Sequence, residues 1–302
     1  MNGGWFEMDI RVLQYFLMVA KAESITKAAE LLNMTQPPLS RQMRELEEEL
    51  GKQLLIRGSK KITLTEDGIL LRKRAEELVS LMEKTRSEIM SSDENINGDV
   101  YIGCAETEAI SFLAKVAQRL QEKNSHIHYH LYSGDAEHIM SRLDKGLIDF
   151  GLVVGSVERY EDNYNCLPLP MKDTWGILMH KSSSLSEKNE IVPEDLIDKP
   201  LIVPHQITSV KAINAWMARD WSEFKIVATY NLIYNASQMA KEKLGYVIGF
   251  DRLINTSGDS ELCFRLLSPR LEIGLSLIWK KYQVFSKASN AFLTEIKKSL
   301  KK

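Results

Sequence analysis

Apolar residues recur at alternating intervals of four and three positions through residues 71–89. This spacing is the a/d pattern of a coiled-coil seam. A single helix cannot bury such a stripe by itself, so a second helix must cover it. The charged flanks favour a helix of a second copy of the chain, and a core helix of the same chain is the alternative. The seam comprises Leu71, Ala75, Leu78, Met82, Thr85 and Ile89, all but Thr85 being the candidate dimerisation residues.

Three shorter helices are expected before this seam. Asp9 is expected to cap the first, Thr26 the second and Thr35 the third, whose first turn tolerates Pro37 and Pro38 because its N–H groups lack intrahelical partners. The third helix has an apolar face with the spacing four, three, four, made of Leu39, Met43, Leu46 and Leu50. Residues 1–7 are expected to be an extension before the folded part.

The opposite face of the third helix gathers hydrogen-bonding and cationic residues at its N-terminal end. Glutamine and arginine can bind base edges in the DNA major groove, while hydroxyl and backbone N–H groups can hold phosphate. Taken alone, a solvated polar face explains this pattern at least as well. The candidate DNA-binding residues here are Thr35, Gln36, Pro37, Pro38, Ser40, Arg41 and Arg44.

The segment after the third helix favours the DNA-binding interpretation. Residues 51–64 contain basic but no acidic residues, and residues 62–64 alternate as in a short strand. Two short helices and a basic hairpin are typical of a winged helix-turn-helix, in which Arg57 and Lys60 would contact phosphate or the minor groove. The acidic residues of 45–49 are then expected to face away from DNA.

Beyond the polar segment 91–97, which is expected to be a hinge, strands alternate with helices. This order predicts an α/β architecture after an all-α winged helix-turn-helix. Strands are expected at 100–103, 127–131, 148–154, 175–179, 201–203, 226–230, 246–250 and 273–279, the third as in a buried parallel sheet. Helices are expected around 112–120, 139–143, 210–219, 236–243 and 286–300, with a helical turn at 194–196.

Residues 13–68 resemble the winged helix-turn-helix of LysR-type transcriptional regulators. The matching positions are Phe16, Ser24, Thr26, Ala28, Ala29, Leu32, the run 35–43, Leu46, Glu47, Leu50, Gly51, Arg57 and the run 64–68. Two mild departures are Leu54-Leu55, where the family usually has Leu-Phe, and Lys60 in place of an arginine. The remaining chain is similar, less specifically, to the family's effector-binding domain, which is like a periplasmic binding protein with two α/β lobes.

The resemblance implies a division of the chain and a set of partners. The expected segments are a winged helix-turn-helix at 8–67, a linker dimerisation helix at 68–90, a hinge at 91–97 and an effector-binding domain at 98–302. Its lobe I would comprise 98–166 and 269–302, and its lobe II 167–268. The implied function is ligand-responsive, sequence-specific transcription regulation by a homodimer or homotetramer. The implied partners are double-stranded DNA and a small effector, with RNA polymerase as a further candidate.

The effector is expected between the lobes, because ligands of open α/β sheets lie beyond the carboxyl ends of strands. That rule selects Ala105, Glu106, Thr107, Asp135, Pro204 and His205. By the resemblance, Thr107 stands where the family commonly has a hydroxyl that holds an effector carboxylate. The ligand is expected to be small and polar, with an anion as one candidate, although Glu106 and Asp135 would repel an anion.

Other signals are weak. The alternating residues His126, His128 and His130 could bind a metal but are better explained as an edge or interface strand, so no metal and no cofactor are expected. Cys104, Cys166 and Cys263 show no CxxC spacing and favour a reducing cytoplasm. The common catalytic motifs are absent from the sequence, so no enzyme is expected. The alternative is a two-lobed solute-binding module or enzyme with a helical dimerisation domain.

Overall fold

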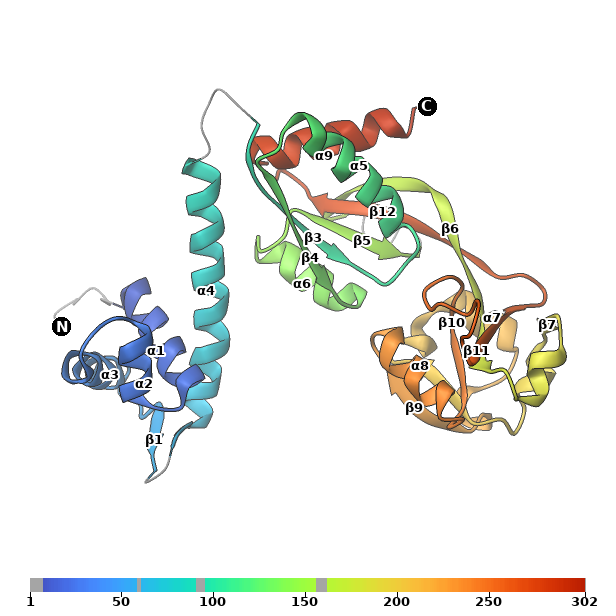
Figure 1. Cartoon of the computed structure of the whole chain (residues 1–302), viewed down its shortest axis with the longest axis horizontal. Coiled ribbons are helices and arrows are strands. Elements are labelled where there is room, and N and C mark those ends of the chain that lie inside the picture. Colours follow the sequence, from blue (N-terminus) through green and yellow to red (C-terminus); the bar gives the residue numbers. More distant parts are fainter. Residues whose placement is uncertain (1–7, 59–60, 91–95, 156–161, 302) are drawn as a thin grey trace. The chain divides into compact units, whose positions relative to one another are not determined.

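The structure is a computed structural model that describes residues 8–58, 61–90, 96–155 and 162–301 (Figure 1). The chain divides into two compact units, with the boundary between residues 90 and 91. The expected α/β class with an N-terminal helix-turn-helix is confirmed. Residues 1–7, Lys60 and residues 91–95 of the expected hinge lie outside the described residues.

The N-terminal unit contains three short helices, a two-stranded hairpin and a long helix. These elements are α1 (Ile10–Ala22), α2 (Ile25–Leu31), α3 (Gln36–Leu50), β1 (Leu55–Arg57), β2 (Ile62–Leu64) and α4 (Glu66–Met90). Phe16, Leu39, Met43 and Leu46 are almost fully buried and form the centre of its core. The apolar face predicted for the third helix is therefore confirmed at its first three positions.

The helix caps agree only in part with the expectation. Asp9 caps α1 by accepting a hydrogen bond from the Arg11 N–H at 2.9 Å. The cap of α2 is Ser24 rather than Thr26, because the helix begins at Ile25 and the Ser24 hydroxyl accepts from the Lys27 N–H. Thr35 occupies the N-cap position of α3 but makes no side-chain cap hydrogen bond there.

The heptad seam of α4 is divided between two environments. At its start, α4 packs along α1, where Ala75 is fully buried and Leu71 packs against the core of the unit. The same-chain alternative therefore holds for Ala75, whose assignment to a dimer seam was wrong, whereas Leu71 is only partly buried and its place in the seam stays a prediction. Further along, Leu78 is 43% exposed, Met82 41% and Ile89 78%. These three leave an uncovered apolar stripe on the helix.

The hairpin of β1 and β2 is held in place by a carboxylate from α3. Glu47 accepts hydrogen bonds from the backbone N–H groups of Leu54 and Leu55 at 2.8 and 2.9 Å. On the other side, the Thr65 hydroxyl donates to the Gln53 carbonyl at 2.7 Å and accepts from the Gly68 N–H. The start of β1 is thus fixed between the end of α3 and the start of α4.

The C-terminal unit begins with a parallel arrangement of strands and helices. It contains β3 (Gly98–Cys104), α5 (Ile110–Lys123), β4 (Ile127–Ser133), α6 (Ala136–Asp144) and β5 (Phe150–Val154). The next elements are β6 (Tyr164–His180), β7 (Glu190–Ile191), β8 (Leu201–Pro204), α7 (Lys211–Met217), β9 (Ile226–Tyr230), α8 (Ile233–Lys241), β10 (Tyr246–Phe250), β11 (Leu262–Leu267), β12 (Glu272–Lys280) and α9 (Lys287–Ser299). The short strands β7 and β11 had no predicted counterpart.

The strands form one mixed array rather than a purely parallel sheet, with the order β4-β3-β5-β12-β6-β10-β8-β9. Strands β3, β4 and β5 are parallel, whereas β12 is antiparallel to β5 and β6. The first part of β6 pairs with β12, and its second part pairs with β10 and β11 (Figure 1). Two hydrophobic regions result, one around Phe150 and Phe292 and the other around Trp175 and Ile177, so the unit has two lobes.

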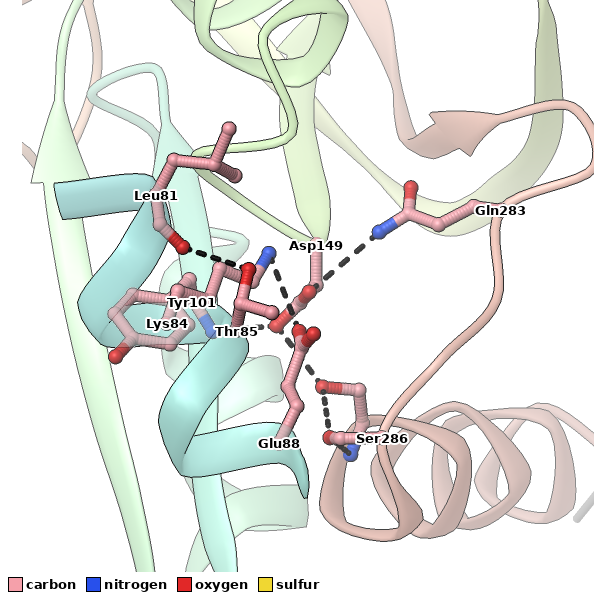
Figure 2. A network of polar contacts seen from close by, with 9 residues as sticks. Leu81, Lys84, Thr85, Glu88, Tyr101, Asp149, Gln283 and Ser286 are labelled. Carbon is pink, nitrogen blue, oxygen red and sulfur yellow. Dashed lines mark hydrogen bonds and ion pairs between the residues drawn. The ribbon is translucent and has the colours of Figure 1, made fainter. Parts of the chain in front are cut away.

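A buried carboxylate ties several elements of the first lobe together. Asp149 is 2% exposed and accepts a hydrogen bond from the Tyr101 N–H at 2.9 Å (Figure 2). It accepts another from the Ser289 hydroxyl, also at 2.9 Å. The Gln283 amide lies 3.5 Å from its other oxygen. Because a buried charge is tolerated only when it is hydrogen-bonded, these donors fix β3, the start of α9 and the segment before it around Asp149.

We predict that Glu47→Ala destabilises the N-terminal unit by about 1–3 kcal/mol, because two buried N–H groups lose their acceptor. Glu48→Ala is the matched control: Glu48 is the exposed neighbour on the same helix and carries the same charge. Denaturant unfolding of the full chain, followed by far-UV circular dichroism, measures the difference. Equal midpoints for the two variants would contradict the role of Glu47.

Candidate DNA-binding surface and ligand cleft

The N-terminal end of α3 presents most of the predicted DNA-binding residues to solvent. The exposed members of the set are Thr35, Gln36, Pro37, Pro38, Arg41 and Arg44. Ser40 differs, because it is only 8% exposed and lies with the buried face of the helix. Ser40 therefore offers little surface beside the exposed residues of the set, and the phosphate contact expected of its hydroxyl stays a prediction.

Arg41 is held by an acidic residue one turn further along α3. Glu45 accepts a hydrogen bond from the Arg41 Nε at 2.7 Å and another from the Gln42 amide at 2.7 Å. The expectation that the whole acidic run faces away from this surface was wrong: Glu45 turns toward Arg41, and Glu47 turns toward the hairpin. The Arg41 side chain is still 80% exposed, so the guanidinium remains accessible.

The hairpin forms the predicted wing. β1 and β2 pair antiparallel from Leu55–Leu64 to Arg57–Ile62, and the Arg57 side chain is exposed. Lys61 lies 3.4 Å from Glu23, and the Ile62 N–H donates to the Glu23 carbonyl at 2.9 Å. The wing is thereby joined to the segment between α1 and α2. Its other predicted contact, Lys60, is outside the described residues.

A cavity of about 190 Å³ lies between the two lobes of the C-terminal unit. The predicted residues Ala105, Glu106, Asp135, Pro204 and His205 all line it. Thr107 does not. It is 2% exposed, accepts a hydrogen bond from the Ala109 N–H at 3.1 Å, and donates to the buried carboxylate of Asp173. Its hydroxyl is occupied within the protein rather than turned to the cavity.

Besides the predicted Pro204 and His205, the second lobe contributes apolar and aromatic walls that were not predicted from the sequence. Trp175, Tyr230, Ile233 and Phe250 line the cavity, and the ring centroids of Trp175 and Phe250 are 4.4 Å apart. Tyr230 and Phe250 end β9 and β10. The rule that ligands lie beyond strand carboxyl ends could have identified these two residues had it been applied to every strand. Trp175, in the middle of β6, carried no such signal.

Two polar contacts connect the lobes across the cleft. The Glu106 carboxylate accepts a hydrogen bond from the Ile233 N–H at the start of α8, and the Gln206 amide donates to Glu137 at 3.3 Å. Burial raises the pKa of Glu106, and the Ile233 N–H opposes that change. Burial would also raise the pKa of Asp135, but hydrogen bonds from His138 outweigh it and the pKa is lowered. Asp135 therefore remains ionised at neutral pH.

The cysteines and histidines give no sign of a redox or metal centre. Burial raises the pKa of Cys104 to about 12 and also raises that of Cys263. His130 stacks on Tyr101 and lies 3.0 Å from Asp99. Among the described residues, no three His, Cys, Asp or Glu side chains are grouped as metal ligands. In the same part of the chain, no helix is both long and apolar enough to cross a membrane.

Comparison with known proteins identifies the family. Residues 10–69 match the bacterial regulatory helix-turn-helix protein, lysR family, and residues 93–301 match the LysR substrate binding domain. The chain therefore belongs to the LysR family of transcriptional regulators, as the resemblance implied.

Individual relatives agree with this assignment. The HTH-type transcriptional regulator BsdA of Bacillus subtilis is 37% identical over 143 residues, which cover 47% of this chain and about half (49%) of BsdA. YwbI, an HTH-type transcriptional regulator of the same organism, is 27% identical and covers 97% of both chains. The crystal structure of CbnR, a LysR family transcriptional regulator, has a TM-score of 0.75 with 18% identity, covering 98% of this chain and 100% of CbnR. The structure of CbnR with its target DNA has a TM-score of 0.73 with 18% identity, covering 97% and 100%. These relatives are named as regulators and not as enzymes.

We predict that only Cys166 reacts readily with a thiol reagent in the folded protein. Cys166 is partly exposed, whereas Cys104 is buried. A thiol with a pKa near 12 is ionised in only about one molecule in ten thousand at pH 8. Titration with Ellman's reagent measures the number of reactive thiols in the folded protein. Cys166→Ser is the control, and peptide mapping identifies the labelled residue. Rapid labelling of Cys104 without denaturant would contradict the prediction.

Proposed function

We propose that the protein is an effector-responsive transcription regulator that binds double-stranded DNA in the cytoplasm. The observation that carries the proposal is the joint presence of an exposed Gln/Arg surface at the start of α3, a basic hairpin beside it, and a cavity between two lobes. A helix-turn-helix places such a helix in the major groove and its wing against the backbone. Arg41, with Gln36 and Arg44, would read bases, and Arg57 would contact phosphate.

The proposed DNA-bound form is a dimer, because a DNA site made of two half-sites needs two recognition helices, one for each half-site. The helix α4 offers a surface through which two copies of the chain can pair. Leu78, Met82 and Ile89 form an exposed apolar stripe on α4, and covering it with a second α4 would remove it from water. We extend the proposal to a tetramer and to contact with RNA polymerase, as family membership implies. The segment and lobe boundaries stated from the sequence are part of the same proposal.

The proposed signal is a ligand that binds the cavity between the lobes. Because a ligand with equal affinity for two arrangements shifts neither, the effector must favour one arrangement of the lobes. Two hydrogen bonds join the lobes at this cavity, one between Glu106 and Ile233 and one between Gln206 and Glu137. A ligand bound in the cavity would therefore act on the contacts that hold the lobes together. The change would reach DNA through the paired α4 helices.

We predict that Arg41→Ala lowers affinity for a selected duplex by about 1–3 kcal/mol and changes affinity for random duplex little, because a base contact is lost. Arg57→Ala should instead weaken binding to both duplexes and reduce the salt slope by about one. Fluorescence anisotropy at several salt concentrations measures both, using a duplex selected from a random pool by the parent protein.

Arg11→Ala is the control for this experiment, since Arg11 is an exposed arginine on α1 that lies 3.4 Å from Asp9. Equal losses on both duplexes for Arg41→Ala would contradict its base contact. Failure of the parent protein to select any sequence would contradict the proposed function itself.

We predict that Leu78→Asp weakens dimerisation at least about tenfold, because burial of one leucine is worth about 1.5–3 kcal/mol and the variant adds a charge. Ser80→Asp introduces the same charge two residues later, on the opposite face of the exposed helix. Sedimentation equilibrium measures the monomer–dimer distribution of each variant. Dissociation by Ser80→Asp and not by Leu78→Asp would place the dimer on another face of α4.

A further inference from the structure

The size of the cavity limits what it can hold. Its volume is about 190 Å³. An engineered protein cavity of roughly 150 Å³ binds benzene, so this space suits one ring with a short substituent. The first lobe contributes the segment after β3 and the start of α6, and the second contributes the ends of β8, β9 and β10. A ligand of this size would contact both lobes.

One part of the cavity is built for a flat apolar group. Trp175 and Phe250 meet edge to face, with centroids 4.4 Å apart and planes inclined by 62°. Ile233 and Ile273 continue this wall. Trp175 is 3% exposed, and its indole N–H has no hydrogen-bond partner among the described residues. That nitrogen has almost no surface open to solvent, so Trp175 offers a ligand apolar contact rather than a hydrogen bond.

The carboxylate side chains that line the cavity give it a negative formal charge. Glu106 and Asp135 line it, His205 is the one lining residue that can become cationic, and no lysine or arginine occurs among the described lining residues. The start of α8 is the point that would attract an anion, because helix N-termini carry partial positive charge. The Glu106 carboxylate already accepts the Ile233 N–H at that point. An incoming carboxylate would displace Glu106 or lie beside it.

A cationic nitrogen of a ligand would be attracted by the carboxylates that disfavour an anion. A carboxylate has about four acceptor positions, and the Ile233 N–H uses one of those of Glu106. An ammonium group beside Glu106 would therefore add charge-assisted hydrogen bonds without breaking the contact between the lobes. Asp135 is committed to the start of α6 and to His138, so it would supply charge at a distance rather than the first contact.

We infer that the cavity binds a single-ring molecule carrying an amine, with the ring against Trp175 and Phe250 and the amine at Glu106. The inference rests on the proposed function in that it takes this cavity as the effector site. It replaces the anion that was one candidate for the small, polar ligand expected from the sequence. It also makes Glu106 the residue that selects the charge of the ligand.

Tyramine and 4-hydroxyphenylacetate test this inference on the full chain. Both carry the same phenol ring on a short side arm, and they differ in the sign of the charge. Isothermal titration calorimetry should show tyramine binding at least about tenfold more tightly than 4-hydroxyphenylacetate, as expected for a charged hydrogen bond. Glu106→Gln should remove that preference, while its amide oxygen can still accept the Ile233 N–H.

Glu137→Gln is the matched control, because it also removes one negative charge and alters the other contact between the lobes without lining the cavity. Its tyramine affinity should stay within about threefold of the parent protein, a difference of less than 1 kcal/mol. Circular dichroism confirms that each variant is folded. An equal loss of tyramine affinity in both variants would show that the lobes, and not the charge of Glu106, determine binding.

Besides an equal loss in both variants, three results would overturn the inference: tighter binding of 4-hydroxyphenylacetate, an unchanged preference in Glu106→Gln, or no tyramine binding with a Kd below about 10 mM. Calorimetry needs no DNA, so it separates this inference from the proposed function. Amine binding by a protein that selects no DNA sequence would contradict only the function. Sequence-specific DNA binding without amine preference would contradict only the ligand class.

Discussion

The antiparallel pairing of β6 with β12 is the interaction on which the C-terminal unit depends. These strands run side by side from Tyr164–Lys280 to Thr174–Glu272, with a register shift between Gly274 and Leu275. β6 then continues into the second lobe, where it pairs with β10 and β11. Because the same strand is central to both lobes, the lobes share a backbone connection directly beside the cavity. Trp175 and Ile273, which line the cavity, lie on these two strands.

Much of this architecture could be predicted, because the period of the apolar residues and the positions of glycine, proline and capping residues indicate local structure well. The strands near 127–131, 201–203 and 246–250 and the helices α5 and α9 follow from their apolar spacing. The two-residue strand β7 is too short to show a period. The buried face of a helix is also wider than a strict repeat indicates: Ser40 lies one residue from Leu39 and three from Met43, at the border of that face.

In the candidate sites too, residue spacing predicts where an element lies, whereas the direction of a side chain depends on contacts that only the folded structure shows. The strand-end rule locates the loop after β3, but it does not tell which side chains of that loop face the cavity and which face the protein core. Thr107 was therefore predicted to line the cavity together with Glu106. The inward turn of Thr107 follows from Asp173, a distant residue on β6 whose buried carboxylate it contacts. In α4, the heptad pattern could not tell which part of the seam α1 covers. These two errors came from contacts between segments far apart in the sequence.

Acidic residues act in both units by occupying positions that another group would otherwise take. Glu45 binds the guanidinium of Arg41, and the Glu106 carboxylate sits at the start of α8. The two cases differ in exposure. The Arg41–Glu45 pair is open to solvent, and exposed ion pairs are worth little, so DNA phosphate or a base edge can replace Glu45 at small cost. Glu106 is partly desolvated, which makes its interactions stronger and its displacement more costly. The exchange of partners is therefore easy where the protein would meet DNA and selective where it would meet a small ligand.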